Sequence, residues 1–90
     1  MNLKKQQWPE WWDWELELCP HLLKRMMDRQ FNEIDLRKML NHARSYRQDI
    51  VDGRWVIVTR HSQCSWEVIV EPDSSSNLLV VITAYPVWEE

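Results

Sequence analysis

Residues 54–85, RWVIVTRHSQCSWEVIVEPDSSSNLLVVITAY, decide the fold. The stretch predicts three consecutive β-strands, which are Arg54–Arg60, Trp66–Glu71 and Leu78–Tyr85. A five-residue loop, His61–Ser65, joins the first two strands, and the turn-forming residues Pro72–Asn77 join the second to the third. Asp52-Gly53 is a tight-turn signal immediately before the first strand. Because the last strand is apolar on both faces, we expect it to lie in the centre of the sheet.

The residues before this stretch predict one more strand and two helices. Apolar and polar residues alternate over 11–18, which is typical of a half-buried strand. Pro20 suits the first position of a helix that continues to Gln30, and Asn32 is a good N-cap for a second helix that ends near Arg44. The order β-α-α-β-β-β predicts an α+β fold, in which two N-terminal helices pack on one face of a four-stranded, mainly antiparallel sheet.

Length and composition limit the classes of protein to which the chain can belong. Its 90 residues, 44% apolar and 28% charged, are enough for one globular domain. We assign residues 11–88 to this domain and residues 1–10 to an N-terminal extension. A single glycine excludes a P-loop or a dinucleotide-binding fingerprint, both of which need several glycines. Two cysteines are too few for the disulfide framework of a small secreted domain, and the first residues lack the apolar run of a secretory signal. We therefore expect a cytoplasmic protein with no membrane partner.

The charge of the chain is unevenly distributed. The net charge is −3, which by itself argues against a nucleic-acid partner. Residues 20–47, however, contain seven lysines and arginines against three acidic residues. Charges more than about 8 Å apart are screened from each other at physiological salt, so this block can present a local positive surface. The alternative is that these residues form the solvated faces of two ordinary helices.

Two groups of polar residues are candidates for chemistry. His21 lies in the first turn of the first helix, with Arg25 one turn further on the same face, so the pair could bind a phosphate and take up a proton. The alternative is a surface histidine with a local hydrogen bond. The second group lies on strands or strand ends and comprises Arg54, Thr59, Arg60, His61, Thr83 and Tyr85. These residue types supply the base, the acid and the cations that metal-free cleavage of a phosphodiester requires, but their spacing does not establish that they converge.

Cysteine and histidine also occur in two short pairs, Cys19-x-His21 and His61-x-x-Cys64, which together hold the four ligands of a structural zinc site. The spacing matches no usual zinc finger, and each cysteine fits equally well as a small buried apolar residue. We predict no metal and no cofactor.

Seven tryptophans are the most unusual feature of the composition. Four fall on expected strand faces and are assigned to the core: Trp12, Trp14, Trp55 and Trp66. Three lie near the ends and are candidates for an exposed patch: Trp8, Trp11 and Trp88. Acidic neighbours would repel a nucleic-acid backbone there, so a protein partner fits this patch better. The last strand also favours self-association, because helices on one face would leave its other apolar side exposed unless a second chain or the Trp-rich segment covers it.

Several segments resemble the bacterial family catalogued as domain of unknown function 4258. They are Pro20-His21-Leu22-Leu23-Lys24-Arg25-Met26 with Arg29, Gly53-Arg54-Trp55, Trp66–Asp73 and Thr83-Ala84-Tyr85-Pro86-Val87. The resemblance covers about residues 15–87. The family has been grouped with the barnase, EndoU, colicin and RelE-like nucleases, which implies a core of N-terminal helices and an antiparallel sheet. Activity and active-site residues vary between branches of that grouping.

Together with the polar groups above, the resemblance implies a RelE-like endoribonuclease of the toxin type, which cuts RNA without a metal by attack of the 2′-hydroxyl. The expected catalytic residues are His21, Arg54 and Tyr85, and the expected substrate-binding residues are Arg25, Arg29, Thr83 and His61. The expected partners are RNA and an antitoxin or another protein. The alternative is a non-catalytic interaction module of the same fold that binds RNA or a protein partner. The sharpest expectation is that His21 and Arg54 act on one phosphate.

Overall fold

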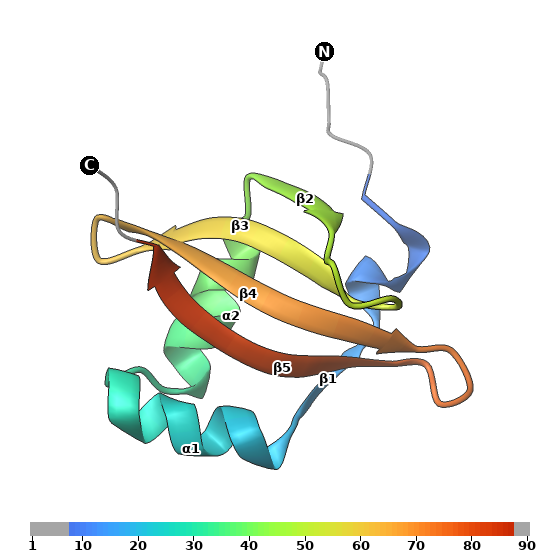
Figure 1. The fold of residues 1–90 in the computed structure, drawn as a ribbon, viewed down its shortest axis with the longest axis horizontal. Coiled ribbons are helices and arrows are strands. Elements are labelled where there is room, and N and C mark those ends of the chain that lie inside the picture. The colour runs from blue at the N-terminus through green and yellow to red at the C-terminus, as the bar shows by residue number, and fades with distance from the viewer. Residues whose placement is uncertain (1–7, 88–90) are drawn as a thin grey trace.

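The computed structural model describes residues 8–87, which form one five-stranded sheet packed against two helices (Figure 1). In chain order the elements are the 3-10 helix η1 (Glu10–Asp13), β1 (Glu15–Leu18), α1 (Pro20–Arg29), α2 (Glu33–Asn41), β2 (Ser45–Gln48), β3 (Trp55–His61), β4 (Cys64–Asp73) and β5 (Leu78–Val87). The fold is therefore α+β, as the sequence predicts. Residues 1–7 of the expected N-terminal extension, and Trp88, lie outside the described residues. None of the described helices is long and apolar enough to cross a membrane.

The strand order in the sheet is β1-β5-β4-β3-β2. The last four strands form an antiparallel meander in which each strand pairs with the next. β1 pairs with β5 in parallel, with Leu16 beside Leu79 and Leu18 beside Val81, so the sheet is mixed. The prediction that the last strand is central is confirmed, because β5 lies between β1 and β4.

The strand expected over residues 11–18 is shorter than predicted. Only its last four residues form β1, and the residues before them form η1. The N–H of Trp12 donates to the Pro9 carbonyl at 3.0 Å, which closes a turn of the 3-10 helix. The indole of Trp11 then packs against the ring of Trp55, with centroids 5.7 Å apart. Aromatic packing therefore overrides the alternating pattern in this segment.

Two predictions about the C-terminal half are wrong in detail. The sheet has five strands rather than four, because β2 was not predicted. Within β2 only Tyr46 packs against the core, and the other three residues are exposed, so no alternation of apolar residues marks the strand. The predicted loop His61–Ser65 is in fact a two-residue turn formed by Ser62 and Gln63. Both residues have positive φ, at 52° and 66°, as a tight hairpin turn requires.

Local signals place the start of both helices. α1 begins at Pro20 and stops before Gln30, which adopts the left-handed conformation with φ 58°. Asn32 caps α2, because its side chain accepts a hydrogen bond from the Asp35 N–H at 2.8 Å. The Asp35 carboxylate in turn accepts one from the Asn32 N–H at 3.0 Å. The two bonds form a capping box that satisfies two backbone donors at the helix start.

α2 ends earlier than predicted, at Asn41 rather than near Arg44. The Arg44 N–H donates to the Val58 carbonyl at 2.8 Å, so the backbone has joined the sheet by this point. The buried hydroxyl of Thr59 on β3 donates to the carbonyl of Met39 in the last turn of α2. These two bonds fix the C-terminal end of α2 beside β3.

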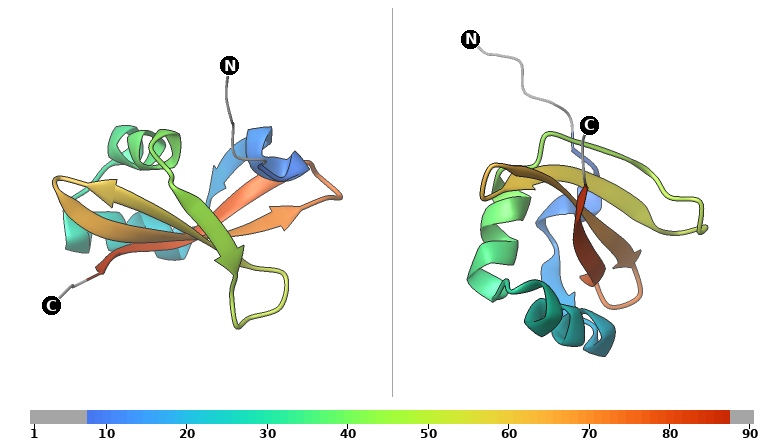
Figure 2. Two further views of the ribbon diagram at one scale, coloured as in Figure 1. Left: turned by 90° about the horizontal axis from the view of Figure 1, so that it is seen from above. Right: turned by 60° about the vertical axis from the view of Figure 1, so that its left-hand side comes forward.

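Both helices bury their apolar stripes in one core on one face of the sheet. α1 contributes Leu22 and Met26, and α2 contributes Leu36 and Met39. The sheet side of this core consists of Ile57, Trp66, Val68, Val70, Leu79, Val81 and Ala84. Figure 2 shows α2 and η1 on the same side of the sheet. The prediction that the helices cover one face is confirmed.

The opposite face is covered by its own polar side chains. Arg47 on β2 donates to Glu67 on β4 at 3.2 Å, and the Tyr85 hydroxyl on β5 donates to the same carboxylate at 2.9 Å. Beside this bridge, Val56 and Ile69 are only 3% and 7% exposed. The large apolar side chains that the described residues do expose lie on the helices and the β2–β3 loop: Leu23, Met27, Ile34, Ile50 and Val51. On β5 itself, Leu78, Val80 and Ile82 are half-buried, so the apolar residues of this strand are only partly exposed and self-association stays a prediction.

Candidate nucleic-acid interface

The residues predicted to share one phosphate lie on different sides of the sheet. His21 is exposed in the first turn of α1, on the helix side. Arg54 pairs with Glu71, with 3.0 Å between Nε and Oε1. Glu71 lies opposite Val80 in the β4–β5 ladder, and Val80 faces away from the helices because both of its chain neighbours are in the core. His21 and Arg54 therefore do not form one site.

Two of the predicted substrate-binding arginines make structural contacts. Arg25 pairs with Asp28 on the surface of α1 at 3.3 Å. Arg29 donates to the Ala84 carbonyl at 3.0 Å and contacts the Thr83 hydroxyl at 3.5 Å. Ala84 lies on the part of β5 that extends past β1, so Arg29 satisfies a backbone group on an otherwise open edge. Arg29 and Thr83 are brought together, and their contact anchors α1 to the sheet.

Tyr85 lies on the helix-free face, away from His21. Burial, together with the hydrogen bond to the Glu67 carboxylate, raises the pKa of Tyr85 to about 12. A hydroxyl with so high a pKa is a weak general acid at neutral pH. Glu67 and Glu71 are separated by four residues, or about 13 Å, along β4. Arg54 and Tyr85 thus share a face but belong to separate contacts.

His61, the remaining candidate, lines a basic pocket at the turn between β3 and β4. Figure 1 shows this turn at one end of the sheet. The pocket has a volume of about 340 Å³ and is lined by His42, Arg44, Arg60, His61, Ser62 and Gln63. Two histidines and two arginines are among its lining residues, and none of the lining residues is acidic. Such a set of donors and cations suits an anion, such as a phosphate or a carboxylate.

Two segments of the chain build this basic pocket. His42 and Arg44 follow the C-terminal end of α2, whereas Arg60 and His61 end β3. The hydrogen bond from the Arg44 N–H to the Val58 carbonyl sets the first segment beside the second. The pocket therefore depends on the junction between α2 and the sheet.

The two histidines are held by different contacts. Nδ1 of His42 lies 2.8 Å from the Lys38 carbonyl, which can only accept, so Nδ1 carries a proton and Nε2 is the nitrogen open to a ligand. The imidazole of His61 packs edge-on against the indole of Trp66, with centroids 5.5 Å apart. Each ring is thus oriented by a neighbour outside the pocket.

The two arginines differ in how freely they can move. Arg60 donates to the Gln63 carbonyl of the turn at 3.0 Å. The guanidinium of Arg44 has no hydrogen-bond or ion-pair partner among residues 8–87. Arg44 is therefore the cation that a ligand can engage without breaking an existing contact.

Sequence reasoning selected His61 and Arg60 but assigned no site to His42 or Arg44. A signal was present, since His42 and Arg44 lie at the end of the expected second helix and Arg60 and His61 end a strand. What brings the two segments together is the pairing of β2 with β3, and β2 carries no apolar pattern.

The four candidate zinc ligands do not gather in the structure. The Cys19 thiol donates to the Ile82 carbonyl at 3.2 Å, and Cys64 is exposed on β4. Over residues 8–87, no group of three or more histidine, cysteine, aspartate and glutamate side chains is placed to hold a metal ion.

Comparisons of the chain with known protein families, with curated proteins and with solved structures find no match. The resemblance to the nuclease grouping therefore rests on the quoted motifs alone.

Proposed function

We propose that this domain binds RNA in the basic pocket and cleaves it there, as a RelE-like endoribonuclease of the toxin type that acts in the cytoplasm. The observation that carries the proposal is that two histidines and two arginines line one pocket that has no acidic residue in its lining. Cleavage by attack of the 2′-hydroxyl needs a base, an acid and cations around the phosphate, and this set supplies all three. The order of two helices before an antiparallel meander supports the RelE-like assignment.

Each side chain has a role in this reaction. One imidazole removes the proton from the 2′-hydroxyl while the 2′-oxygen bonds to phosphorus, and the other protonates the 5′-oxygen as its bond to phosphorus breaks. Nε2 is the reacting nitrogen of His42, because Nδ1 is held by the Lys38 carbonyl. Arg44 and Arg60 bind the non-bridging oxygens and stabilise the negative charge of the transition state. The products are a 2′,3′-cyclic phosphate and a 5′-hydroxyl end.

The test measures cleavage of a labelled single-stranded RNA by the purified protein in the presence of EDTA. We expect His42→Ala and His61→Ala each to lower the rate about 100- to 10,000-fold, the usual cost of removing a general acid or base. His21→Ala is the matched control, because it removes an exposed imidazole from α1 and should leave the rate unchanged. A DNA strand of the same sequence should bind without being cut, since it lacks the attacking hydroxyl.

Three results would count against this proposal. If His21→Ala lowers the rate as much as His42→Ala, the reaction takes place elsewhere on the molecule. If the wild-type protein binds RNA in the pocket but never cuts it, the domain is a non-catalytic RNA-binding module. If it neither binds nor cuts RNA, the proposal fails altogether.

A further inference from the structure

β1 is an edge strand with backbone groups that point away from the sheet. The Cys19 N–H donates to the Val81 carbonyl of β5 at 3.3 Å. Alternate residues of a parallel strand bond to the same neighbour, so Leu16 and Leu18 direct their N–H and C=O groups to the other side. β1 ends the strand order, and within residues 8–87 no strand lies on that side. Two residues of β1 can therefore pair with an added strand.

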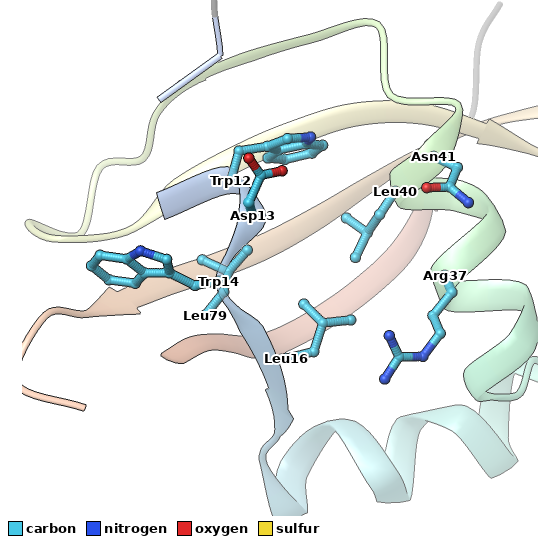
Figure 3. Close-up of a pocket in the computed structure, with 8 residues that line it drawn as sticks. All are labelled: Trp12, Asp13, Trp14, Leu16, Arg37, Leu40, Asn41 and Leu79. Carbon is cyan, nitrogen blue, oxygen red and sulfur yellow. The ribbon is translucent and has the colours of Figure 1, made fainter. Parts of the chain in front are cut away.

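The same two leucines line two pockets on the helix side of β1. Leu16 lines a pocket of about 280 Å³ between η1, β1 and α2, together with residues that include Trp12, Trp14 and Leu40 (Figure 3). Leu18 lines a pocket of about 320 Å³, together with residues that include Leu23, Met27 and Phe31. Arg37 of the first pocket pairs with Glu33 of the second at 2.9 Å, so the two pockets adjoin.

The other face of β1 is acidic. Glu15 and Glu17 are exposed and lie beside Leu78 and Val80 of β5, whose side chains point away from the helices. Neither glutamate has an ion-pair partner in the described part of the chain. A strand added to this edge would meet an apolar pocket at every second residue and a carboxylate at the residues between.

We infer that the free edge of β1 binds an extended segment of a partner protein in which apolar residues alternate with lysine or arginine. The backbone of the segment pairs with Leu16 and Leu18, as in other complexes where a peptide adds a strand to a sheet. Its apolar side chains, about 6.6 Å apart along the strand, lie against the two pockets and cover Met27, which is 82% exposed. Its basic side chains lie beside Glu15 and Glu17.

A second copy of β1 fits this edge poorly. Pairing two β1 strands would bring the exposed glutamates of both copies together on one face, and like charges on adjacent strands are destabilising. Charged residues on an edge strand commonly prevent such self-pairing. Charge complementarity therefore favours a basic partner over a second copy of this chain.

The probe for this edge is a labelled ten-residue peptide of alternating leucine and lysine, with a leucine–glutamate peptide as comparison. We expect only the first to bind, and we expect binding to slow hydrogen exchange at the amides of Leu16 and Leu18. The double variant Glu15→Gln/Glu17→Gln should lower the affinity about 2- to 30-fold, the range for two cross-strand ion pairs. Glu10→Gln/Asp52→Asn is the matched control, because it removes two exposed carboxylates away from the face of β1.

Several outcomes would overturn this inference. Equal losses in the two double variants would mean that the peptide responds only to overall charge. Slowed exchange in β2 rather than β1 would place the peptide on the opposite edge of the sheet. Protection of Leu16 and Leu18 in the free protein, together with a dimer in solution, would make a second copy the occupant.

Discussion

Removing the charge of Arg44 gives the most direct measure of whether the basic pocket holds a phosphate. The guanidinium of Arg44 has no partner in the described residues, and its backbone N–H is held by the Val58 carbonyl whatever the side chain. Arg44→Gln should therefore change binding and leave the free energy of unfolding unchanged within about 0.5 kcal/mol, as surface substitutions usually do.

The size of the effect follows from the release of counterions. Each phosphate that a protein contacts on a single strand contributes about −0.7 to the slope of log K against log salt concentration. Arg44 and Arg60 bind the same phosphate in the proposed site, so together they should contribute about −0.7, and Arg44→Gln should remove about half of that. The same relation gives an affinity loss of about 2.2-fold at 0.1 M salt and about 1.5-fold at 0.3 M salt.

The assay is fluorescence anisotropy of a labelled single-stranded RNA, made non-cleavable by 2′-deoxy substitution, over a range of salt concentrations. Arg25→Gln is the matched control, since it also removes one guanidinium but from the surface of α1, where it pairs with Asp28. The reasoning is refuted if Arg44→Gln leaves the salt slope unchanged, or if Arg25→Gln changes it equally.

Three further predictions concern stability. Thr59→Val should lower the free energy of unfolding in urea by about 1–2 kcal/mol, because the Met39 carbonyl loses the buried hydroxyl that donates to it. An unchanged midpoint of urea unfolding would contradict this contact. Asn32→Ala should lower the free energy of unfolding by about 1 kcal/mol, because it removes the capping box of α2. An unchanged midpoint of thermal unfolding would contradict this role of the cap. The raised pKa of Tyr85 contributes stability that is complete below pH 10 and is lost as pH rises towards 12, because the unfolded chain releases the proton first. One pKa unit corresponds to about 1.4 kcal/mol, and after allowance for solvent screening the contribution amounts to about 1 kcal/mol. The free energy of unfolding of the wild-type protein should fall by about that much between pH 9.5 and 11.5, whereas that of Tyr85→Phe should not.

The parts of the fold that could be predicted depend on local signals. The two-sided apolar pattern of Leu78–Tyr85 places β5 between two strands, since a strand buried on both faces and flanked by others has no polar side to expose. Asn32 marks the start of α2 because its side chain satisfies a backbone donor three residues away. Both inferences need only neighbouring residues.

The parts that could not be predicted depend on distant contacts. β2 is polar because it lies at an edge and buries only Tyr46, so its identity as a strand comes from pairing with β3. Tryptophans alternate with other residues before β1, as in a strand. The rings of Trp11 and Trp55 nevertheless pack together, and the backbone there forms the 3-10 helix η1.

The same limit applies to the candidate site. His21 attracts attention because a helix start is a local signal, yet its side chain lies on the opposite side of the sheet from Arg54. His42 and His61 line one pocket only because the chain after α2 returns to β3. No spacing along the sequence encodes that proximity.

The parallel pairing of β1 with β5 has a consequence for how the chain folds during its synthesis. β1 leaves the ribosome early, but its partner Leu78–Val81 follows about 60 residues later, so closing this pair carries a large loop entropy. Until β5 has emerged, the apolar faces of β1, α1 and β4 have no central strand to cover them. We therefore expect the nascent chain to remain open to chaperones until residues 78–87 leave the exit tunnel, and a chain stalled before Leu78 to be a target for proteolysis.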